Sequence, residues 1–138
     1  MSGSQKSIAD GRYRLVDVLG AGGMATVWRA YDERLQVYRA VKVLSRTLQQ
    51  HSVIQERFLT EARTMARLHH PNIVSVHDIG TDGATSYIVM ELVDGGSLMD
   101  HLAENGPMPA AMAVDATLAL LAALAIAHEN GVIHRDIK

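Results

Sequence analysis

The chain has 138 residues, 48% of them hydrophobic and 20% charged, which excludes a disordered segment and fits a single globular domain. Its formal net charge of −2 gives no reason to expect nucleic acid or an anionic membrane as a partner. Because the sequence contains no cysteine, disulfides, thiol catalysis and thiolate metal sites are excluded.

The first predicted elements are two strands, Tyr13–Leu19 and Val27–Asp32, which follow a polar segment at residues 1–11. We expect this segment to be a flexible tail. Its first nine residues lack the apolar core of a signal peptide, so none is expected. The glycine-rich "GAGGMA" joins the two strands, with glycines at positions 20, 22 and 23. Glycine lets backbone N–H groups approach a phosphate without interference from a Cβ atom.

The glycine-rich segment alone leaves three interpretations open. It departs from the G-x-G-x-x-G pattern at Ala25, so a plain hairpin turn explains it as well as a phosphate-binding loop does. A dinucleotide-binding βαβ unit is the third interpretation, and it requires a helix directly after the glycines. The β-branched and aromatic "TVWRAYD" that follows predicts a strand, which favours a hairpin over the phosphates.

A single charge interrupts the third predicted strand, Tyr38–Leu44. Ala40, Lys42 and Leu44 share one face of this strand, because side chains alternate with period two. A lysine in a strand ordinarily faces solvent. An inward position for Lys42 would need an anionic partner, since a buried charge is costly unless it is paired.

The following predicted helix, Gln55–Leu68, carries a possible partner. At about 100° per residue, Phe58, Met65 and Leu68 form one apolar stripe, and Glu61 falls in its middle. We therefore expect Glu61 to face the core and to pair with Lys42. The alternative is that Glu61 lies on the edge of the stripe and reaches solvent.

Two further strands and two helices complete the chain. The strands Ile73–Ile79 and Tyr87–Leu92 lead to the turn-like "VDGGS", the expected boundary between regions 12–93 and 94–138. The helices are Leu98–Asn105 and Ala110–Asn130. The second is very apolar, but alanine dominates it and a charge interrupts it, so a buried helix is favoured over a membrane span. Five antiparallel strands with one inserted helix, followed by helices, predict an α+β fold.

In this order, five features resemble a bacterial-type Ser/Thr protein kinase. They are the glycine-rich loop, "AVK" ending at Lys42, Glu61 on the next helix, the "YIVMELVDGGSL" strand and hinge, and "HRDIK" at the end of the chain. The resemblance covers residues 12–138. It implies a kinase small lobe and hinge at 12–93 and the first, incomplete part of a helical lobe at 94–138.

The resemblance also implies the cofactors ATP and Mg²⁺ and a role for each matching residue. Lys42 would hold the α- and β-phosphates, Glu61 would fix Lys42, Asp136 would accept or orient the proton of the substrate hydroxyl, and Lys138 would neutralise the γ-phosphate. The residues implied in nucleotide binding are Leu19, Gly20, Ala21, Gly22, Gly23, Val27, Ala40, Lys42, Met90 as gatekeeper, Glu91 and Val93. His134 would be structural, and no metal ligand is expected among residues 1–138.

The resemblance further implies that the protein substrate carries Ser or Thr, and that the catalytic part is cytoplasmic, with any membrane anchor beyond residue 138. The kinase asparagine, the D-F-G segment and the activation loop are expected beyond "HRDIK", so we expect this segment alone to be inactive and to self-associate through its apolar helix. The alternatives are a non-catalytic nucleotide- or partner-binding module and an unrelated nucleotide-binding oxidoreductase.

Overall fold

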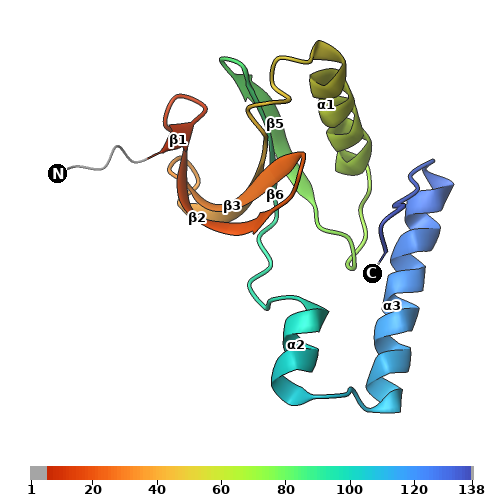
Figure 1. Ribbon diagram of the computed structural model, residues 1–138. Helices are drawn as coiled ribbons and strands as arrows, with labels where there is room; N and C mark the ends of the chain where they lie inside the picture. Colours follow the sequence, from red (N-terminus) through yellow and green to blue (C-terminus); the bar gives the residue numbers. More distant parts are fainter. Residues whose placement is uncertain (1–5, 138) are drawn as a thin grey trace. The chain divides into compact units, whose positions relative to one another are not determined.

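The computed structural model describes residues 6–137, which form two compact units. The first comprises the chain up to Arg67 together with Ser75–Leu92, and the second comprises Leu68–Val74 together with the chain from Val93 onwards. Leu68–Val74 therefore lies outside the unit that holds the strands, although the predicted region 12–93 includes it. All described strands and the first helix belong to the first unit (Figure 1).

The first unit is a curled antiparallel sheet with one helix beside it (Figure 1). Its strands lie in the order β1-β2-β3-β4-β6-β5. The α+β architecture predicted from the sequence is confirmed. The elements of the first unit are β1 (Ser7–Ile8), β2 (Tyr13–Ala21), β3 (Ala25–Asp32), β4 (Val37–Leu44), α1 (Ser52–Ala66), β5 (Val76–Asp82) and β6 (Thr85–Met90).

The strand β1 corrects the predicted count of five. Ser7 and Ile8 pair with β2, and Ile8 is only 6% exposed. The flexible-tail prediction is therefore wrong for residues 6–11, while residues 1–5 lie outside the described part of the chain. A two-residue strand is too short for a periodic pattern to reveal it, because its formation depends on the partner edge that β2 offers.

A hydrogen bond joins the two edges of the curled sheet. The backbone N–H of Ala9, directly after β1, donates to the carboxylate of Asp82 at the end of β5, with 2.7 Å between nitrogen and oxygen. Since β1 and β5 are the outermost strands, this contact links the two edges of the sheet without strand pairing between them.

The two faces of the sheet are packed differently. On one face, α1 covers a core formed by Ala25, Leu44, Phe58, Ala62 and Ile88. On the other, the curl of the sheet brings together a second core, which consists of Ile8, Tyr13, Leu15, Ala30, Val41, Tyr87 and Val89. The alternation along β4 assigns Val41 to the second core and Lys42 to the face that α1 covers.

The helix α1 does not bury Glu61. Its buried residues are Phe58 and Ala62, whereas Glu61 is exposed, so the prediction that Glu61 lies in the middle of the stripe is wrong. Leu68, which had shifted the predicted stripe toward Glu61, lies beyond the end of the helix at Ala66. The small side chain of Ala62 belongs to the stripe instead and moves its centre away from Glu61.

The second unit contains α2 (Leu98–Asn105) and α3 (Ala110–Glu129). Ser97 begins α2 through a capping box, in which its side chain accepts from the Asp100 N–H and the Asp100 carboxylate accepts from the Ser97 N–H. Asn72 donates to the carbonyl of Ala119 at 3.0 Å, which ties the segment Leu68–Val74 to α3.

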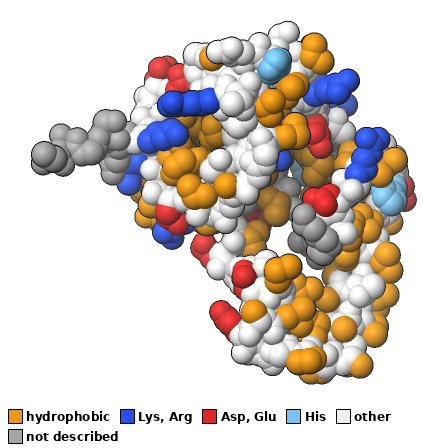
Figure 2. All heavy atoms as spheres, in the orientation of Figure 1, with side chains coloured by type: hydrophobic (Ala, Val, Ile, Leu, Met, Phe, Trp, Pro, Cys, Tyr) orange, Lys and Arg blue, Asp and Glu red, His pale blue; other side chains and the backbone are white. Residues whose placement is uncertain are grey.

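The helix α3 presents most of its apolar side chains to the surface (Figure 2). Of its residues only Ala123 and Ala127 are buried, so α3 is not buried within the described part of the chain, and the apolar surface expected of this segment is present. By length and composition alone, α3 is the one described helix that could cross a membrane, a test that core helices of soluble proteins also pass. The exposed large residues of α2 and α3 include Leu98, Met99, Leu102, Met112, Val114, Leu118, Leu120 and Leu121.

Candidate functional site

The glycine-rich segment forms the turn of the β2–β3 hairpin. Gly20 pairs with Val27, and the N–H of Gly22 donates to the carbonyl of Ala25 at 3.0 Å. A strand follows the glycines, so the helix that a dinucleotide-binding βαβ unit requires is absent from this position. The dinucleotide-binding interpretation of the glycines, on which the oxidoreductase alternative rests, is therefore wrong.

The hairpin turn itself does not require its glycines. Gly20, Gly22 and Gly23 all lack a positive φ. A Cβ atom added at Gly20 or Gly23 would meet nothing within 4 Å, and one at Gly22 would meet only the Ala25 carbonyl at 4.0 Å. Backbone strain and close packing thus leave the three glycines unexplained, and the space above the turn is open.

Lys42 lies on β4, opposite Val27 of β3 and Ile88 of β6. Its side chain is half-buried, and its Nζ atom lies 5.9 Å from the centre of the Phe58 ring on α1. This distance fits a cation–π contact. Sequence reasoning did not predict Phe58 as a contact of Lys42, although Phe58 was on the predicted apolar stripe.

Lys42 and Glu61 form no ion pair among the described residues. Glu61 follows Phe58 by three residues, so it lies on a neighbouring position of the same helix surface. Phe58 thus places the ammonium of Lys42 near the part of α1 that carries Glu61, without a described ion pair.

Other predicted site residues share the face of Lys42. Ala40 is 7% exposed and pairs with Met90, which packs against the core under α1. Val27 is half-buried, while Leu19 and Ala21 are exposed on β2. The first unit therefore brings the glycine hairpin, Val27, Ala40, Lys42 and Met90 to one curved surface.

The segment after β6 contains the two predicted hinge positions. The backbone N–H of Glu91 donates to the Ser75 carbonyl at 2.9 Å, and a carboxylate oxygen of Glu91 accepts from the Ser75 N–H at 3.3 Å. The N–H and the carboxylate of Glu91 are thus both engaged with Ser75. Val93 is 60% exposed and belongs to the second unit.

The "HRD" tripeptide lies in the second unit, after α3. The Asp136 N–H donates to Nδ1 of His134 at 3.1 Å, so the histidine ring holds the backbone of the predicted base. Arg135 has a φ of 67°, which is uncommon for a residue with a side chain and is a form of strain found at functional sites. Lys138 lies outside the described residues.

No group of three or more His, Asp or Glu side chains that could hold a metal ion occurs within residues 6–137.

The protein kinase domain family matches residues 13–138. The chain is 48% identical to the serine/threonine-protein kinase PksC of Streptomyces coelicolor over 96% of its own length and 25% of that protein. It is 45% identical to PknA of Mycobacterium tuberculosis over 93% of its length and 31% of PknA. The chain thus spans about a quarter to a third of these relatives.

Two solved structures show the same fold. The PknI kinase domain of Mycobacterium tuberculosis has a TM-score of 0.79 and 31% identity over 100% of this chain and 56% of that one. Rad53 in complex with AMP-PNP has a TM-score of 0.83 and 29% identity over 96% of this chain and 34% of that one. With a family match that covers all elements from β2 to the "HRD" segment, the chain belongs to the protein kinase family.

Proposed function

We propose that the protein that carries this chain is a Ser/Thr kinase, which transfers the γ-phosphate of ATP to Ser or Thr hydroxyls of a protein substrate. The observation that supports this most directly is the shared surface of the first unit. There, glycines that the hairpin itself does not need lie on the strand beside a half-buried lysine. The relatives named as Ser/Thr kinases support the substrate class.

In this proposal the first unit binds ATP. The backbone of Gly20, Ala21, Gly22 and Gly23 covers the phosphates, and Lys42 holds the α- and β-phosphates. Leu19, Val27 and Ala40 enclose the adenine from one side, and Met90 limits the depth of its pocket. The Glu91 carbonyl bonds the adenine edge. The neighbouring structure with AMP-PNP supports a nucleotide as the ligand.

The second unit supplies the groups for the substrate hydroxyl. Asp136 orients or accepts its proton, and His134 holds the Asp136 backbone in place for that task. Lys138 neutralises charge on the transferred phosphate. Mg²⁺, when bound, would neutralise the phosphate oxygens during transfer. We place this activity in the bacterial cytoplasm, in keeping with the bacterial relatives.

The test compares two variants of β4 in a protein that carries this chain. Lys42→Met removes the proposed phosphate ligand, and we expect turnover with Mg²⁺-ATP and a protein substrate to fall by about 10²–10³-fold. Arg39→Met is the matched control, because Arg39 lies on the opposite face of the same strand and should leave turnover unchanged. Equal activity of the wild type and Lys42→Met would refute the proposed role of Lys42.

A companion measurement separates catalysis from binding alone. Asp136→Asn should keep the affinity for ATP while turnover falls, because Asp136 acts on the substrate hydroxyl. A wild-type protein that binds ATP but transfers no phosphate to any Ser or Thr would instead support the non-catalytic binding module.

A further inference from the structure

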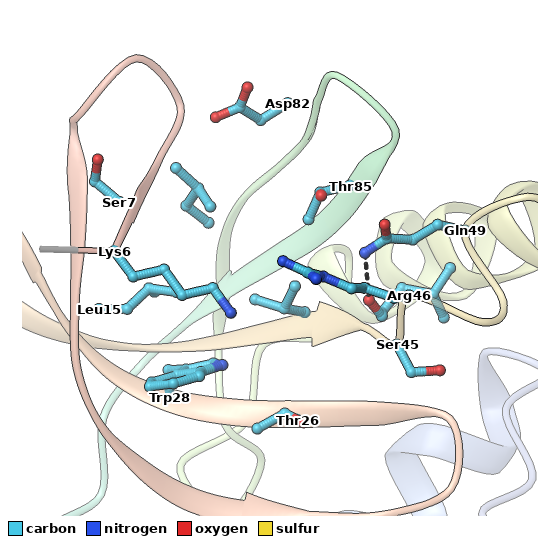
Figure 3. A pocket seen from close by; sticks show the side chains of 13 residues that line it. Lys6, Ser7, Leu15, Thr26, Trp28, Ser45, Arg46, Gln49, Asp82 and Thr85 are labelled. Atoms are coloured by element: carbon cyan, nitrogen blue, oxygen red, sulfur yellow. Dashed lines mark hydrogen bonds between the residues drawn. The ribbon is translucent and has the colours of Figure 1, made fainter. Parts of the chain in front are cut away.

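The first unit contains a second concave site, on the face of the sheet away from α1. A cavity of about 460 Å³ opens at the mouth of the curled sheet (Figure 3). Strands β1 to β6 and the connection between β4 and α1 all contribute to its wall. Lys42 and the glycine turn are not among its lining residues, so the cavity is distinct from the proposed ATP surface.

Two cations converge in this cavity. The side chains of Lys6 and Arg46 extend toward one another from opposite sides (Figure 3). Lys6 lies over the face of Trp28, with its Nζ atom 5.1 Å from the ring centre. Neither cation forms an ion pair with a carboxylate among the described residues. Like charges that face each other without a counter-ion favour binding of an anion between them.

The one carboxylate of the cavity is already engaged. Asp82 accepts the N–H of Ala9 and lies at the upper rim, away from the two cations (Figure 3). The hydroxyl groups of Ser7, Thr26 and Thr85 add hydrogen-bond donors to the wall. The cavity therefore has a cationic centre with neutral donors around it.

The rest of the wall is apolar. Ile8, Leu15, Trp28 and Val43 line it, and all four belong to or pack against the core on this face of the sheet. A cavity of this size, with apolar walls and a few converging polar groups, has the properties of a small-molecule site. Inorganic phosphate would satisfy the cations and leave the apolar wall without a partner.

We propose that this cavity binds a small organic phosphate, with its phosphate between Lys6 and Arg46 and its apolar or ring body against Trp28 and Val43. Arginine and lysine are the usual phosphate ligands, and the planar guanidinium can donate two parallel bonds to one phosphate. The proposal does not depend on the kinase activity proposed above.

The test uses the single tryptophan of the chain. Its indole N–H gives one resonance in a ¹H–¹⁵N spectrum of the ¹⁵N-labelled chain, and Trp28 lies in the wall of the cavity. Titration with phenyl phosphate should shift this resonance to saturation. Phenol and inorganic phosphate, which carry only half of the recognised groups each, should bind at least roughly tenfold more weakly, a difference of about 1.4 kcal/mol.

Variants locate the site. Arg46→Gln and Lys6→Gln should each weaken phenyl phosphate at least tenfold, whereas Lys42→Met, on the opposite face, should leave its affinity unchanged. Circular dichroism melts of each variant show whether the fold is kept. If Lys6→Gln unfolds, the affinity of Arg46→Gln for phenyl phosphate is compared with that of the wild type.

Three results would overturn the proposal: no shift with millimolar phenyl phosphate, an unchanged affinity in a folded Arg46→Gln, or loss of binding in Lys42→Met alone. Anionic phospholipid vesicles that displace phenyl phosphate would assign the cavity to a lipid headgroup and would also refute a small-molecule ligand.

Discussion

The Nζ atom of Lys42 rests 5.9 Å from the Phe58 ring and forms no described ion pair with Glu61. The lysine is therefore positioned by an aromatic face of α1 and not by the helix carboxylate. Because helix movement is a common means of switching between states, a Lys42–Glu61 pair that forms only when ligand is bound is consistent with this arrangement. The distinction has a measurable consequence.

Glu61→Gln should leave stability almost unchanged and reduce turnover. Glu61 is exposed and lacks a described ion pair, so the free energy of unfolding should change by less than about 0.5 kcal/mol. If the pair forms during catalysis, phosphate transfer should still fall. Thermal melts and steady-state assays of a protein that carries the chain separate the two effects. A large loss of stability with normal turnover would show that Glu61 stabilises the fold and is not needed for phosphate transfer.

Gly20→Ala should weaken nucleotide binding without a loss of stability. The added Cβ meets nothing within 4 Å and the backbone is not in the left-handed region, so the melting temperature should be that of the wild type. Under the proposed function the methyl group intrudes on the phosphates, and affinity for ATP should fall by about tenfold, or about 1.4 kcal/mol. Unchanged affinity in calorimetry would argue against phosphate binding at this turn.

Gly80→Ala, in contrast to Gly20→Ala, should reduce the stability of the fold. A Cβ atom at Gly80 would lie 2.5 Å from the hydroxyl oxygen of Tyr87, its cross-strand partner in the β5–β6 pair. Tyr87 is 6% exposed and part of a core, so it has little freedom to move. We expect a loss of about 1–3 kcal/mol in stability from this overpacking. Gly20→Ala is the matched control, and equal melting temperatures for both variants would contradict the packing argument.

Asp32 should make the fold sensitive to acid. It is 1% exposed and accepts hydrogen bonds from the Arg12 guanidinium at 3.0 and 3.2 Å and from the N–H groups of Arg34 and Leu35. Burial by itself raises the pKa of Asp32, but the bonds from Arg12 and the two backbone N–H groups outweigh it, so the pKa is lowered.

The sign of the pH effect follows from this lowered pKa. Asp32 contributes stability above its ordinary pKa of 3.8, and this contribution is lost as pH falls through the lower folded value. Asp32→Asn should therefore reduce stability at neutral pH by about 1–3 kcal/mol, because hydrogen bonds to a charged group are lost. Its unfolding free energy should depend less on pH below about 3.8 than that of the wild type. Parallel pH profiles for both proteins would contradict this assignment.

The sequence predicted long elements well, and local pattern explains why. The bounds of Leu98–Asn105 were predicted correctly, because the capping serine and the glycine after the helix are local features. The strand β1 was missed because it exists only through its pairing with β2. Glu61 was misplaced because the position of its stripe depended on where α1 ends and on a buried alanine. Neither property is local.

In the candidate site, too, features that depend on local motifs were predicted and features that depend on distant residues were not. The order of motifs was sufficient to predict the family, and of the positions that the resemblance implied, Val27, Ala40 and Met90 lie beside Lys42. Phe58 beside Lys42 and the cavity between Lys6 and Arg46 depend on residues far apart in the chain. No sequence motif links such residues. Their contacts could be identified only from the folded sheet.

The hydrogen bond from Ala9 to Asp82 decides where a shortened version of this domain should begin. The family match starts at residue 13, which would suggest trimming the chain there. That cut would remove β1, the Ala9 donor and the bond from the Leu15 N–H to the Lys6 carbonyl. It would leave the outer edge of β2 with unpaired backbone groups, ready to pair with another molecule. Expression work on this domain should therefore keep the chain from residue 6 onwards.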